Sequence, residues 1–461
     1  MACSVDEKLP LKPTNAKPKA ISRVSCRCLN FSLAAGLVAP KVLNVLCSAS
    51  QSSMESFLSV FYEHTAGFSK VQIGWLSTIP SIFCLVAPPF WGAVADCLHN
   101  QRLVHIVCIV SISVLMLFMQ YFRDFNGAMI MAVLANFQLA PCGSLLDHAI
   151  LDLLAQVGGE YGRQRLFGSI GWGLGAYITG VMVGAWDISW AFNMSFVFSM
   201  AMVPVLRSIP PPVDQAVCHH NQDLEIATEE LSNSSSVSFL DSMRTLVLRR
   251  PDVLVLLVVV FFMSLMFGIV STFLPIYMYN LSGNNAQIIG VATLCETASE
   301  LPAFFFSHRL IGRIGTVNVL LLGTAAYALR ITFYATMTNA WNALAFSFLH
   351  GVTFALTWAT TTEYLYDAAP SGTVGTVIGL LNTVQNSLGS AAGALVGGYL
   401  YDNYGAQSMW WVANVGVPVT MVALAVFAYT KRKCNPNAPH ASQEQGRVMP
   451  DACVEITASA N

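Results

Sequence analysis

The sequence predicts an all-α membrane protein with twelve transmembrane helices in two six-helix bundles. Hydrophobic residues make up 55% of the chain and charged residues only 10%, whereas soluble domains carry roughly 25% charged residues. Apolar segments of about twenty residues recur along the chain, which is the length that a helix needs to cross a hydrocarbon core about 30 Å thick. One long polar stretch near the middle divides these segments into two sets.

The chain begins with a polar segment, residues 1–37, which is Lys- and Pro-rich at its start and has no hydrophobic periodicity. This composition predicts a disordered cytoplasmic tail. The first thirty residues have no early apolar run, so we expect no cleavable signal peptide.

The apolar segments follow in order, and each predicts one membrane-spanning helix. They lie at 39–62, 71–95, 103–122, 128–154, 165–185, 189–206, 253–279, 287–306, 317–336, 341–364, 373–400 and 408–430. The sequence therefore predicts an N-terminal bundle over 38–207 and a C-terminal bundle over 251–430. A cytoplasmic linker rich in Ser, Asp and Glu joins them over 208–250, and a cytoplasmic tail follows over 431–461.

The basic residues predict the orientation, because Lys and Arg concentrate on the cytoplasmic side of a membrane protein. With the N-terminus inside, only Lys70 and Arg123 of the basic residues near the spans fall outside. We therefore expect both termini in the cytoplasm. We also expect a monomer, and the plasma membrane rather than an internal one.

The segment from Gly159 to Gly184 carries the strongest signal for function. Its glycines let two helices pack closely, while Arg165 and Trp172 are two helical turns apart on one face. Asp147 lies in the preceding span. A carboxylate and a guanidinium can pair and can bind hydroxyl groups, and a tryptophan ring offers a flat face to a sugar. The alternative is a glycine-packed helix whose arginines only mark the cytoplasmic side.

The motif Tyr161-Gly-Arg-Gln-Arg-Leu-Phe-Gly-Ser-Ile-Gly-Trp172 resembles helix V of the oligosaccharide:proton symporters of the major facilitator superfamily, the branch that includes lactose permease. The resemblance implies that Asp147, Arg165 and Trp172 form a sugar site, with Asp in place of the usual Glu. It also implies that Ser169 stands where the family has a cysteine near the sugar.

A second resemblance lies between the second and third predicted spans. Gly92-Ala-Val-Ala-Asp96 followed by Arg102 resembles the loop signature of the superfamily. It implies a cytoplasmic gate of Gly92, Asp96 and Arg102, in which Asp96 holds an arginine when the inner face is closed. The alternative is that Asp96 only caps the loop.

Besides Glu363, near a helix end, the apolar segments of the second half hold four charged residues or histidines: Glu296, Glu300, Arg330 and His350. A charge in the membrane costs about 2.5–3.5 kcal/mol on an insertion scale, so we expect these groups to pair. Glu296 and Glu300 share one helical face, and two carboxylates at that spacing resist being ionised together. We therefore predict a proton-coupling cluster. The alternative is a static ion-pair cluster that fixes helix packing.

The same family resemblance extends to Thr293–Glu296, Leu329–Ile331 and Leu349–His350, which are similar to its proton-coupling stretches. The chain departs from the family at Thr353, where a glutamate is usual, and at Asn386, near the position of a lysine. The resemblance implies transport of a sugar. Because Thr353 and Asn386 differ from the family, we expect other residues to carry the coupled proton.

The predicted function is secondary transport by alternating access, namely proton-coupled symport of a sugar or a similar small polar solute. The alternatives are a receptor or scaffold of the same fold that no longer transports, or a uniporter of a nucleoside or organic acid. We expect no enzyme, because no HExxH or GxGD motif occurs. The twelve cysteines show no CxxC spacing, so we expect neither a metal site nor a cofactor. A net charge of −2 suggests no nucleic-acid partner, which leaves the solute, protons and the lipid bilayer.

Two further residues have open interpretations. Glu55, in the first predicted span, can line the cavity or lie near the outer surface. Asn280, in an Asn-Leu-Ser sequon, is placed at the outer end of its helix, close to the membrane for glycosylation.

Overall fold

The computed structural model describes residues 25–84, 86–98, 101–157, 161–208, 250–369 and 374–434. Most of the predicted N-terminal tail, nearly all of the linker and most of the C-terminal tail therefore lie outside the described residues. The described residues form helices joined by short turns, with no strand among them. This agrees with the predicted all-α class.

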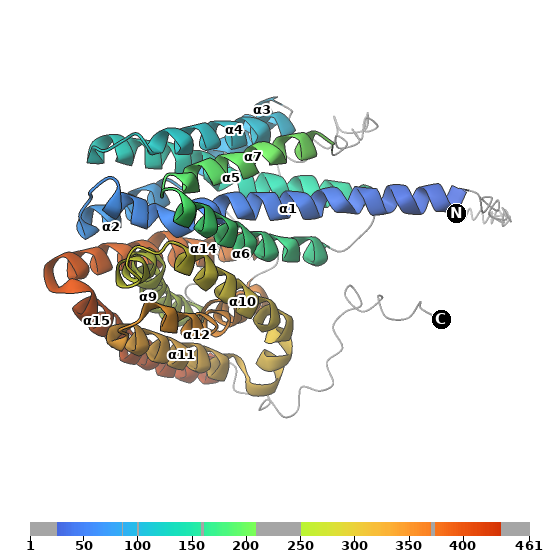
Figure 1. Cartoon of the computed structure of the whole chain (residues 1–461). Coiled ribbons are helices and arrows are strands. Elements are labelled where there is room, and N and C mark those ends of the chain that lie inside the picture. The colour runs from blue at the N-terminus through green and yellow to red at the C-terminus, as the bar shows by residue number, and fades with distance from the viewer. Residues whose placement is uncertain are drawn as a thin grey trace, which may run out of the picture.

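The first seven helices form one layer of the structure (Figure 1). They are α1 (Ser25–His64), α2 (Lys70–Phe83), α3 (Ala87–Leu98), α4 (Gln101–Met119), α5 (Phe125–Val157), α6 (Tyr161–Ala185) and α7 (Trp190–Ser208). The predicted span 71–95 is divided between α2 and α3. Pro88 lies in the first turn of α3. A proline is tolerated there, because it lacks an N–H group that the first turn does not need, but it would break a helix that continued from upstream.

The remaining helices form the second layer (Figure 1). They are α9 (Pro251–Leu281), α10 (Gln287–Ile314), α11 (Thr316–Thr336), η1 (Ala340–Asn342), α12 (Ala343–Ser347), η2 (Gly351–Leu356), α13 (Thr357–Ala368), α14 (Val374–Asn382), η3 (Thr383–Ser390) and α15 (Ala391–Cys434). Both η2 and η3 are π-helical turns, which often occur at functional sites. The last two predicted spans are joined at Gly405, whose φ of 82° favours glycine.

Nine of the described helices are long and apolar enough to cross a membrane. The last of them covers the final two predicted spans, one on each side of the bend at Gly405. With α1 and the divided α2–α3 segment, the described helices account for all twelve predicted spans. The prediction of an all-α membrane fold is confirmed.

The two layers pack directly against each other through α6 and α10, α2 and α15, and α1 and α9. Small residues permit this close approach. A Cβ atom on Gly74 of α2 would lie 2.7 Å from the carbonyl oxygen of Ala394, and one on Gly290 of α10 would lie 2.7 Å from that of Ala176. Side chains at these two glycines would push the layers apart.

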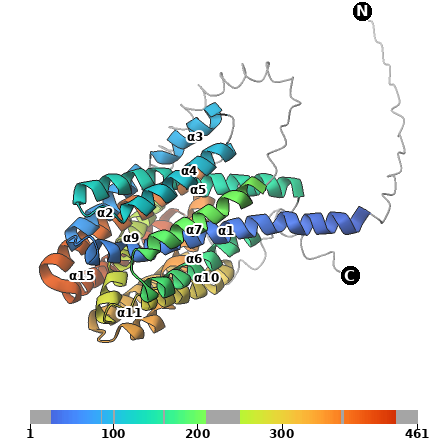
Figure 2. The ribbon, with the colours of Figure 1, turned by 45° about the horizontal axis from the view of Figure 1, so that its top comes forward.

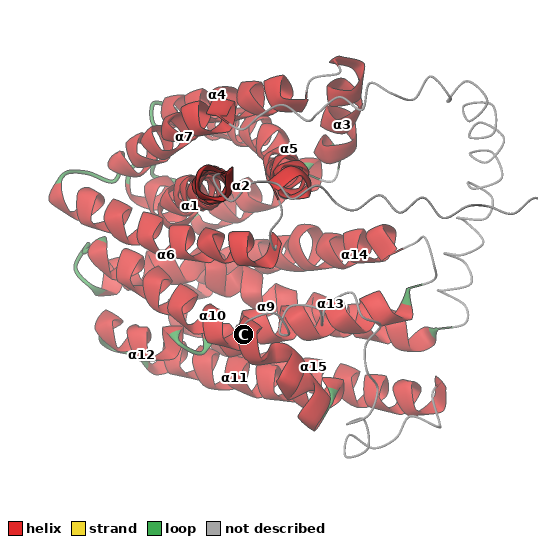
Figure 3. Cartoon of the chain, turned by 90° about the vertical axis from the view of Figure 1, so that its right-hand side faces the viewer, coloured by secondary structure: helices red, strands yellow, loops and turns green. Residues whose placement is uncertain are grey.

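The start of α1 and the end of α15 lie at the same end of the bundle (Figure 1; Figure 2). We call this end the inner end, following the orientation predicted from the basic residues, and the opposite end the outer end. Figure 3 looks onto the inner end, and there the described residues are helices and short loops.

Candidate functional site

A group of polar side chains joins the two layers at the outer end. We call Glu63, His64, Lys70, Asn280 and Asp402 the outer cluster. His64 Nε2 lies 2.6 Å from Asn280 Oδ1, and Asn280 Nδ2 donates to Glu63 Oε1 at 3.3 Å. Lys70 Nζ donates to Glu63 Oε1 at 2.5 Å, and the Lys70 main-chain N–H donates to Asp402 Oδ1 at 3.4 Å. The bonds of Asn280 and Asp402 tie the two layers together at the outer end.

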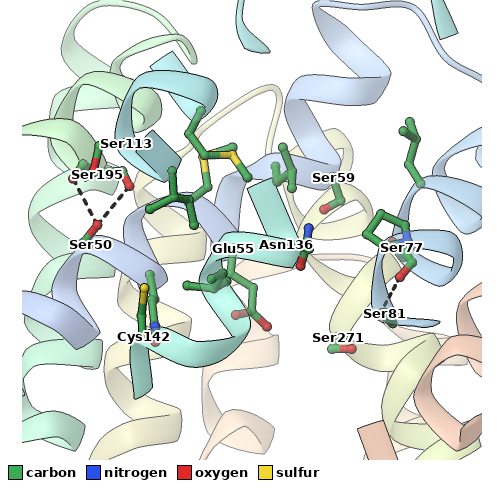
Figure 4. Close-up of a pocket in the computed structure, with 18 of the residues that line it drawn as sticks. Ser50, Glu55, Ser59, Ser77, Ser81, Ser113, Asn136, Cys142, Ser195 and Ser271 are labelled. Atoms are coloured by element: carbon green, nitrogen blue, oxygen red, sulfur yellow. Dashed lines mark hydrogen bonds between the residues drawn. The ribbon is translucent and has the colours of Figure 1, made fainter. Parts of the chain in front are cut away.

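A cavity of about 380 Å³ lies between α1, α2, α4, α5 and α7 on one side and α9, η3 and α15 on the other. Its volume falls in the range of roughly 300–1,000 Å³ that is typical of small-molecule sites. Hydroxyl and amide groups line much of it (Figure 4). The polar lining comprises Ser50, Gln51, Glu55, Ser59, Tyr62, Ser77, Ser81, Ser113, Asn136, Ser195, Ser199, Ser271, Thr272 and Ser390.

Some of these hydroxyl groups are already paired inside the first layer. Ser50 Oγ lies 2.6 Å from Ser199 Oγ and 3.1 Å from Ser195 Oγ, and this contact ties α1 to α7. Ser113 donates to the carbonyl of Ile109 at 2.6 Å. Such groups keep the cavity wall polar while serving the packing of the helices.

Three polar groups on α1 lack this pairing. Ser59 Oγ and Tyr62 Oη are buried and have no hydrogen-bond partner among the described residues. Glu55 lines the cavity, and its side chain is exposed there. Of the two interpretations left open for Glu55, the structure selects the one in which it lines the cavity.

The predicted pair on α5 and α6 is formed. Arg165 Nη1 donates to both carboxylate oxygens of Asp147, at 2.8 and 3.1 Å. The Arg165 side chain is 59% exposed, so the pair can be reached from outside the protein. Neither Asp147 nor Arg165 is among the residues that line the cavity, but Asp147 follows the cavity-lining Cys142 by five residues on α5.

The two other residues predicted for the sugar site lie further along the same helix, α6. Trp172 and Ser169 are both half-buried. Trp172 is seven residues after Arg165, which places it two turns along the same face of α6. Their roles stay predictions.

Arg330, on α11, is the centre of a buried hydrogen-bond network. Its guanidinium pairs with Glu296 of α10 and donates from Nε to the Tyr334 hydroxyl at 2.7 Å. Its Nη1 lies 2.9 Å from His350 Nδ1 and donates to Thr353 Oγ1 at 3.3 Å. Because Arg330 is only 1% exposed, the partners must satisfy nearly all of its donors.

His350 links this network to the second carboxylate of α10. Its Nε2 lies 3.1 Å from Glu300 Oε1. A guanidinium can only donate, so His350 Nδ1 must accept from Arg330 and the ring proton must sit on Nε2, facing Glu300. The structure thus brings together all four residues predicted for proton coupling: Glu296, Glu300, Arg330 and His350.

The predicted gate residues Gly92 and Arg102 lie on the first layer. Helix α3, which carries Gly92, packs on α4 and α5 of its own layer and stands at its edge (Figure 2). A Cβ on Gly92 would meet nothing within 4 Å, and Arg102 is half-buried at the start of α4. The Asp96 side chain lies outside what the structure describes, so the gate stays a prediction.

Residues 38–412 match the model of the MFS_1 like family. The maltose permease of Geobacillus stearothermophilus is 26% identical over 381 residues, covering 81% of this chain and 90% of that protein. The raffinose permease of Escherichia coli is 23% identical over 409 residues, covering 85% and 91%.

Two solved structures share the fold. The nucleoside transporter NupG superposes with a TM-score of 0.66 at 17% identity, covering 86% of this chain and 99% of that one. The D-xylose-proton symporter superposes with a TM-score of 0.63 at 13% identity, covering 85% and 97%.

Proposed function

Since the chain belongs to the MFS_1 like family, a multi-pass membrane transporter family rather than a family of enzymes, we propose that it carries a sugar or a similar small polar solute together with a proton. The resemblance to the oligosaccharide:proton symporter branch is confirmed by the maltose, raffinose and melibiose permeases among its relatives. The solute and the coupling ion are our proposal.

The observation that carries the proposal is the exposed Asp147–Arg165 pair, whose carboxylate follows Cys142, in the wall of a hydroxyl-lined cavity, by five residues on α5. A guanidinium and a carboxylate that already face each other can each turn one edge toward the hydroxyl groups of a sugar. Trp172 then supplies an apolar face for the ring, and Ser169 a further hydroxyl. The permeases among the relatives favour a sugar as the solute.

Proton coupling is assigned to the network of Glu296, Glu300, Arg330 and His350. In the described geometry Arg330 donates to His350 Nδ1. A proton added at Nδ1 would turn this acceptor into a donor and would break the contact with Arg330. Proton uptake by His350 and the present position of Arg330 therefore exclude each other, which is the property that a coupling switch needs.

Alternating access follows from the state of the two ends. The outer cluster closes the outer end, whereas Arg165 is exposed near the inner end of α6. This conformation would release solute inward. The halves 38–207 and 251–430 would then move against each other about the site, with Asp96 and Arg102 closing the inner end in the opposite state.

A nucleoside uniporter is the second candidate. The fold similarity to NupG and the absence of Lys, Arg and His among the described residues that line the cavity suit a neutral hydroxylated solute. An organic acid fits less well, because Glu55 would repel its charge. A non-transporting receptor is disfavoured, since a scaffold has no need for an accessible ion pair.

Uptake into proteoliposomes tests these candidates directly. We would measure labelled maltose, raffinose, melibiose, D-xylose and uridine with and without an inward pH gradient. Accumulation of one of the sugars above its external concentration only with the gradient is expected. Gradient-independent uptake of uridine would favour the uniporter, and uptake of none of the five would favour the receptor.

We further propose that both termini lie in the cytoplasm, that the protein works as a monomer, and that it resides in the plasma membrane. The basic residues at the inner end support the orientation. Impermeant labelling of cysteines placed in the two tails of intact cells tests it, and labelling of either tail from outside would reverse the assignment.

A further inference from the structure

A second, much smaller cavity lies inside the second layer, next to the Arg330 network. It measures about 20 Å³ and lies between α9, α11, α13 and the two π-helical turns η2 and η3. This space is too small for a sugar, but it exceeds the roughly 10–15 Å³ that one water molecule needs. The polar part of its lining comprises Ser264, Tyr327, Thr353, Thr357, Thr361 and Gln385.

Three of these polar side chains lack partners. Tyr327 is 2% exposed, Ser264 4% and Gln385 9%. The two hydroxyl groups and the amide of Gln385 nevertheless form no hydrogen bond with another described residue. Unsatisfied buried polar groups are costly, and native proteins pair nearly all of them with protein groups or with ordered water. The three side chains therefore need a ligand in the cavity.

The threonines of the cavity wall supply acceptors. Thr357 donates to the carbonyl of Thr353 at 2.6 Å, and Thr361 donates to the carbonyl of Thr357 at 3.0 Å. A hydroxyl oxygen whose proton is engaged in this way can still accept through its two lone pairs. Thr353 donates to the carbonyl of Leu349 at 3.2 Å and accepts from Arg330 at 3.3 Å, which leaves it one lone pair. The wall thus offers both donors and acceptors.

A water molecule fits this wall better than a metal cation does. Water can donate two hydrogen bonds and accept two, and a buried water typically makes about three. Tyr327 and Gln385 can donate to it, and the threonine oxygens can accept from it. A cation would find no carboxylate among the described residues of the lining. The guanidinium of Arg330, which is bonded to Thr353, would also repel it.

We propose that the small cavity binds a water molecule, which bridges Tyr327 and Gln385 to the lone pair of Thr353 that Arg330 leaves free. A bridging water is nearly as good a partner as a direct hydrogen bond. The water therefore holds Thr353 in place, and Thr353 in turn holds the guanidinium. Tyr327 and Gln385 are positioning residues of the proton-coupling network. This role rests on the proposed proton coupling, whereas the presence of the water does not.

The water also joins the proton-coupling network to the wall of the large cavity. Gln385 belongs to η3, and Ser390, the last residue of η3, lines the large cavity between the layers. A solute that displaces η3 would therefore act on Arg330 through Gln385, the water and Thr353. A two-state element that both sites contact is the physical requirement for coupling between them.

X-ray footprinting of the purified full-length chain in detergent tests whether the cavity is wet. Radiolysis turns a bound water into a hydroxyl radical that oxidises a neighbouring methionine to its sulfoxide, while a scavenger in the buffer removes radicals formed in bulk water. Met263 lines the small cavity, whereas Met266 on the same helix does not, and both are buried. With scavenger, we expect oxidation of Met263 well above that of Met266. Equal oxidation of the two would mean a dry cavity and would overturn the proposal.

Two variants test the bridge and its role. Tyr327→Phe and Gln385→Met keep the approximate size of the side chain and remove one donor to the water. Both should lose the oxidation of Met263. Both should also accumulate labelled maltose about three- to tenfold less on a pH gradient, the loss expected for one neutral hydrogen bond. Exchange of labelled for unlabelled maltose, which needs no net proton movement, should be retained and would show that the variants are folded.

Matched controls are Tyr404→Phe, at a tyrosine that is 62% exposed, and Gln407→Met, at an exposed glutamine. Both lie outside the small cavity, so both should keep the oxidation of Met263 and the accumulation of maltose at wild-type levels.

The two measurements separate the water from its role. Met263 oxidation retained in both cavity variants would show that Tyr327 and Gln385 do not hold the water. Loss of that oxidation with wild-type accumulation would show that the water does not position Arg330. A wild type that accumulates no sugar on a pH gradient, but in which Met263 is oxidised, would remove the proton coupling and with it this role, and would leave the water site.

Discussion

Nη1 of Arg330, a residue that is only 1% exposed, lies 2.9 Å from Nδ1 of His350. Since a guanidinium cannot accept a hydrogen bond, this contact fixes the tautomer of His350 and directs its remaining ring proton at Glu300. The contact therefore couples the protonation of His350 to the position of Arg330.

The first prediction separates the two carboxylates of α10. Glu296→Gln leaves the buried guanidinium of Arg330 without its charged partner, and breaking such a pair typically costs about 3–5 kcal/mol. Glu300→Gln keeps the Arg330–Glu296 pair, so its stability should change by less than about 1 kcal/mol. Thermal unfolding in detergent checks this order, and equal stabilities would contradict the description of the network.

The same two variants also test coupling. Both should lose accumulation driven by a pH gradient, while Glu300→Gln should retain exchange of labelled for unlabelled solute, which requires no net proton movement. The measurement is uptake into preloaded proteoliposomes. Normal accumulation in both variants would exclude α10 as the proton carrier.

The second prediction concerns the solute pair. Arg165→Lys keeps the charge but loses the planar fork that reaches Asp147 and a solute together, so uptake should fall at least about tenfold. Trp172→Tyr should retain weak uptake, because an aromatic face remains, and Trp172→Ala should lose it. Arg165→Lys with wild-type affinity in a binding assay would remove Arg165 from the site.

The third prediction uses the glycines between the layers. Gly74→Ala would place a methyl group 2.7 Å from the carbonyl oxygen of Ala394, and overpacking of this kind typically costs about 1–3 kcal/mol. Gly379→Ala, where a Cβ meets nothing within 4 Å, is the control and should be neutral or slightly stabilising. The melting temperature and the uptake rate of each variant measure the effect of the added methyl group. A fully active Gly74→Ala would show that transport does not depend on the close approach of α2 to α15.

The fourth prediction concerns the outer cluster. Glu63 accepts from both Lys70 and Asn280, so Glu63→Gln should weaken the outer closure and raise the population of the outward-open state. A cysteine introduced at Ser59 should then react faster with an impermeant thiol reagent added from outside. Asp187→Asn, in the outer loop between α6 and α7, is the control, and identical labelling rates in both would mean that the cluster does not hold the outer end.

Much of the fold could be predicted from the sequence, because hydrophobic length alone marks a membrane helix. The break between α2 and α3 was not predicted, since an apolar segment that contains Pro88 still has the length of one span. The division between the last two predicted spans agrees with the structure, because the backbone leaves the helical conformation at Gly405, between 373–400 and 408–430.

The candidate site was predictable where a local motif carries it. Arg165 stands in such a motif, and Asp147 was placed opposite it by the family resemblance. Glu55 could not be placed, because polar and apolar residues are mixed around the whole of α1, so periodicity does not tell which face meets lipid and which meets a cavity. The cavity is lined by residues of α1, α2, α4, α5, α7 and α9. The spacing of these residues along the chain does not predict that they lie close together in the fold.

The outer cluster also bears on the sequon at Asn280. The amide nitrogen that would carry a glycan is the atom that donates to Glu63 across the two layers. A glycan attached there would stand between the layers at the outer end, so a glycosylated chain could not reach the conformation described here. Treatment with a glycosidase should therefore leave the mobility of the active protein unchanged, and in a secretory pathway the folding of the two layers onto each other would compete with the transferase for this one side chain.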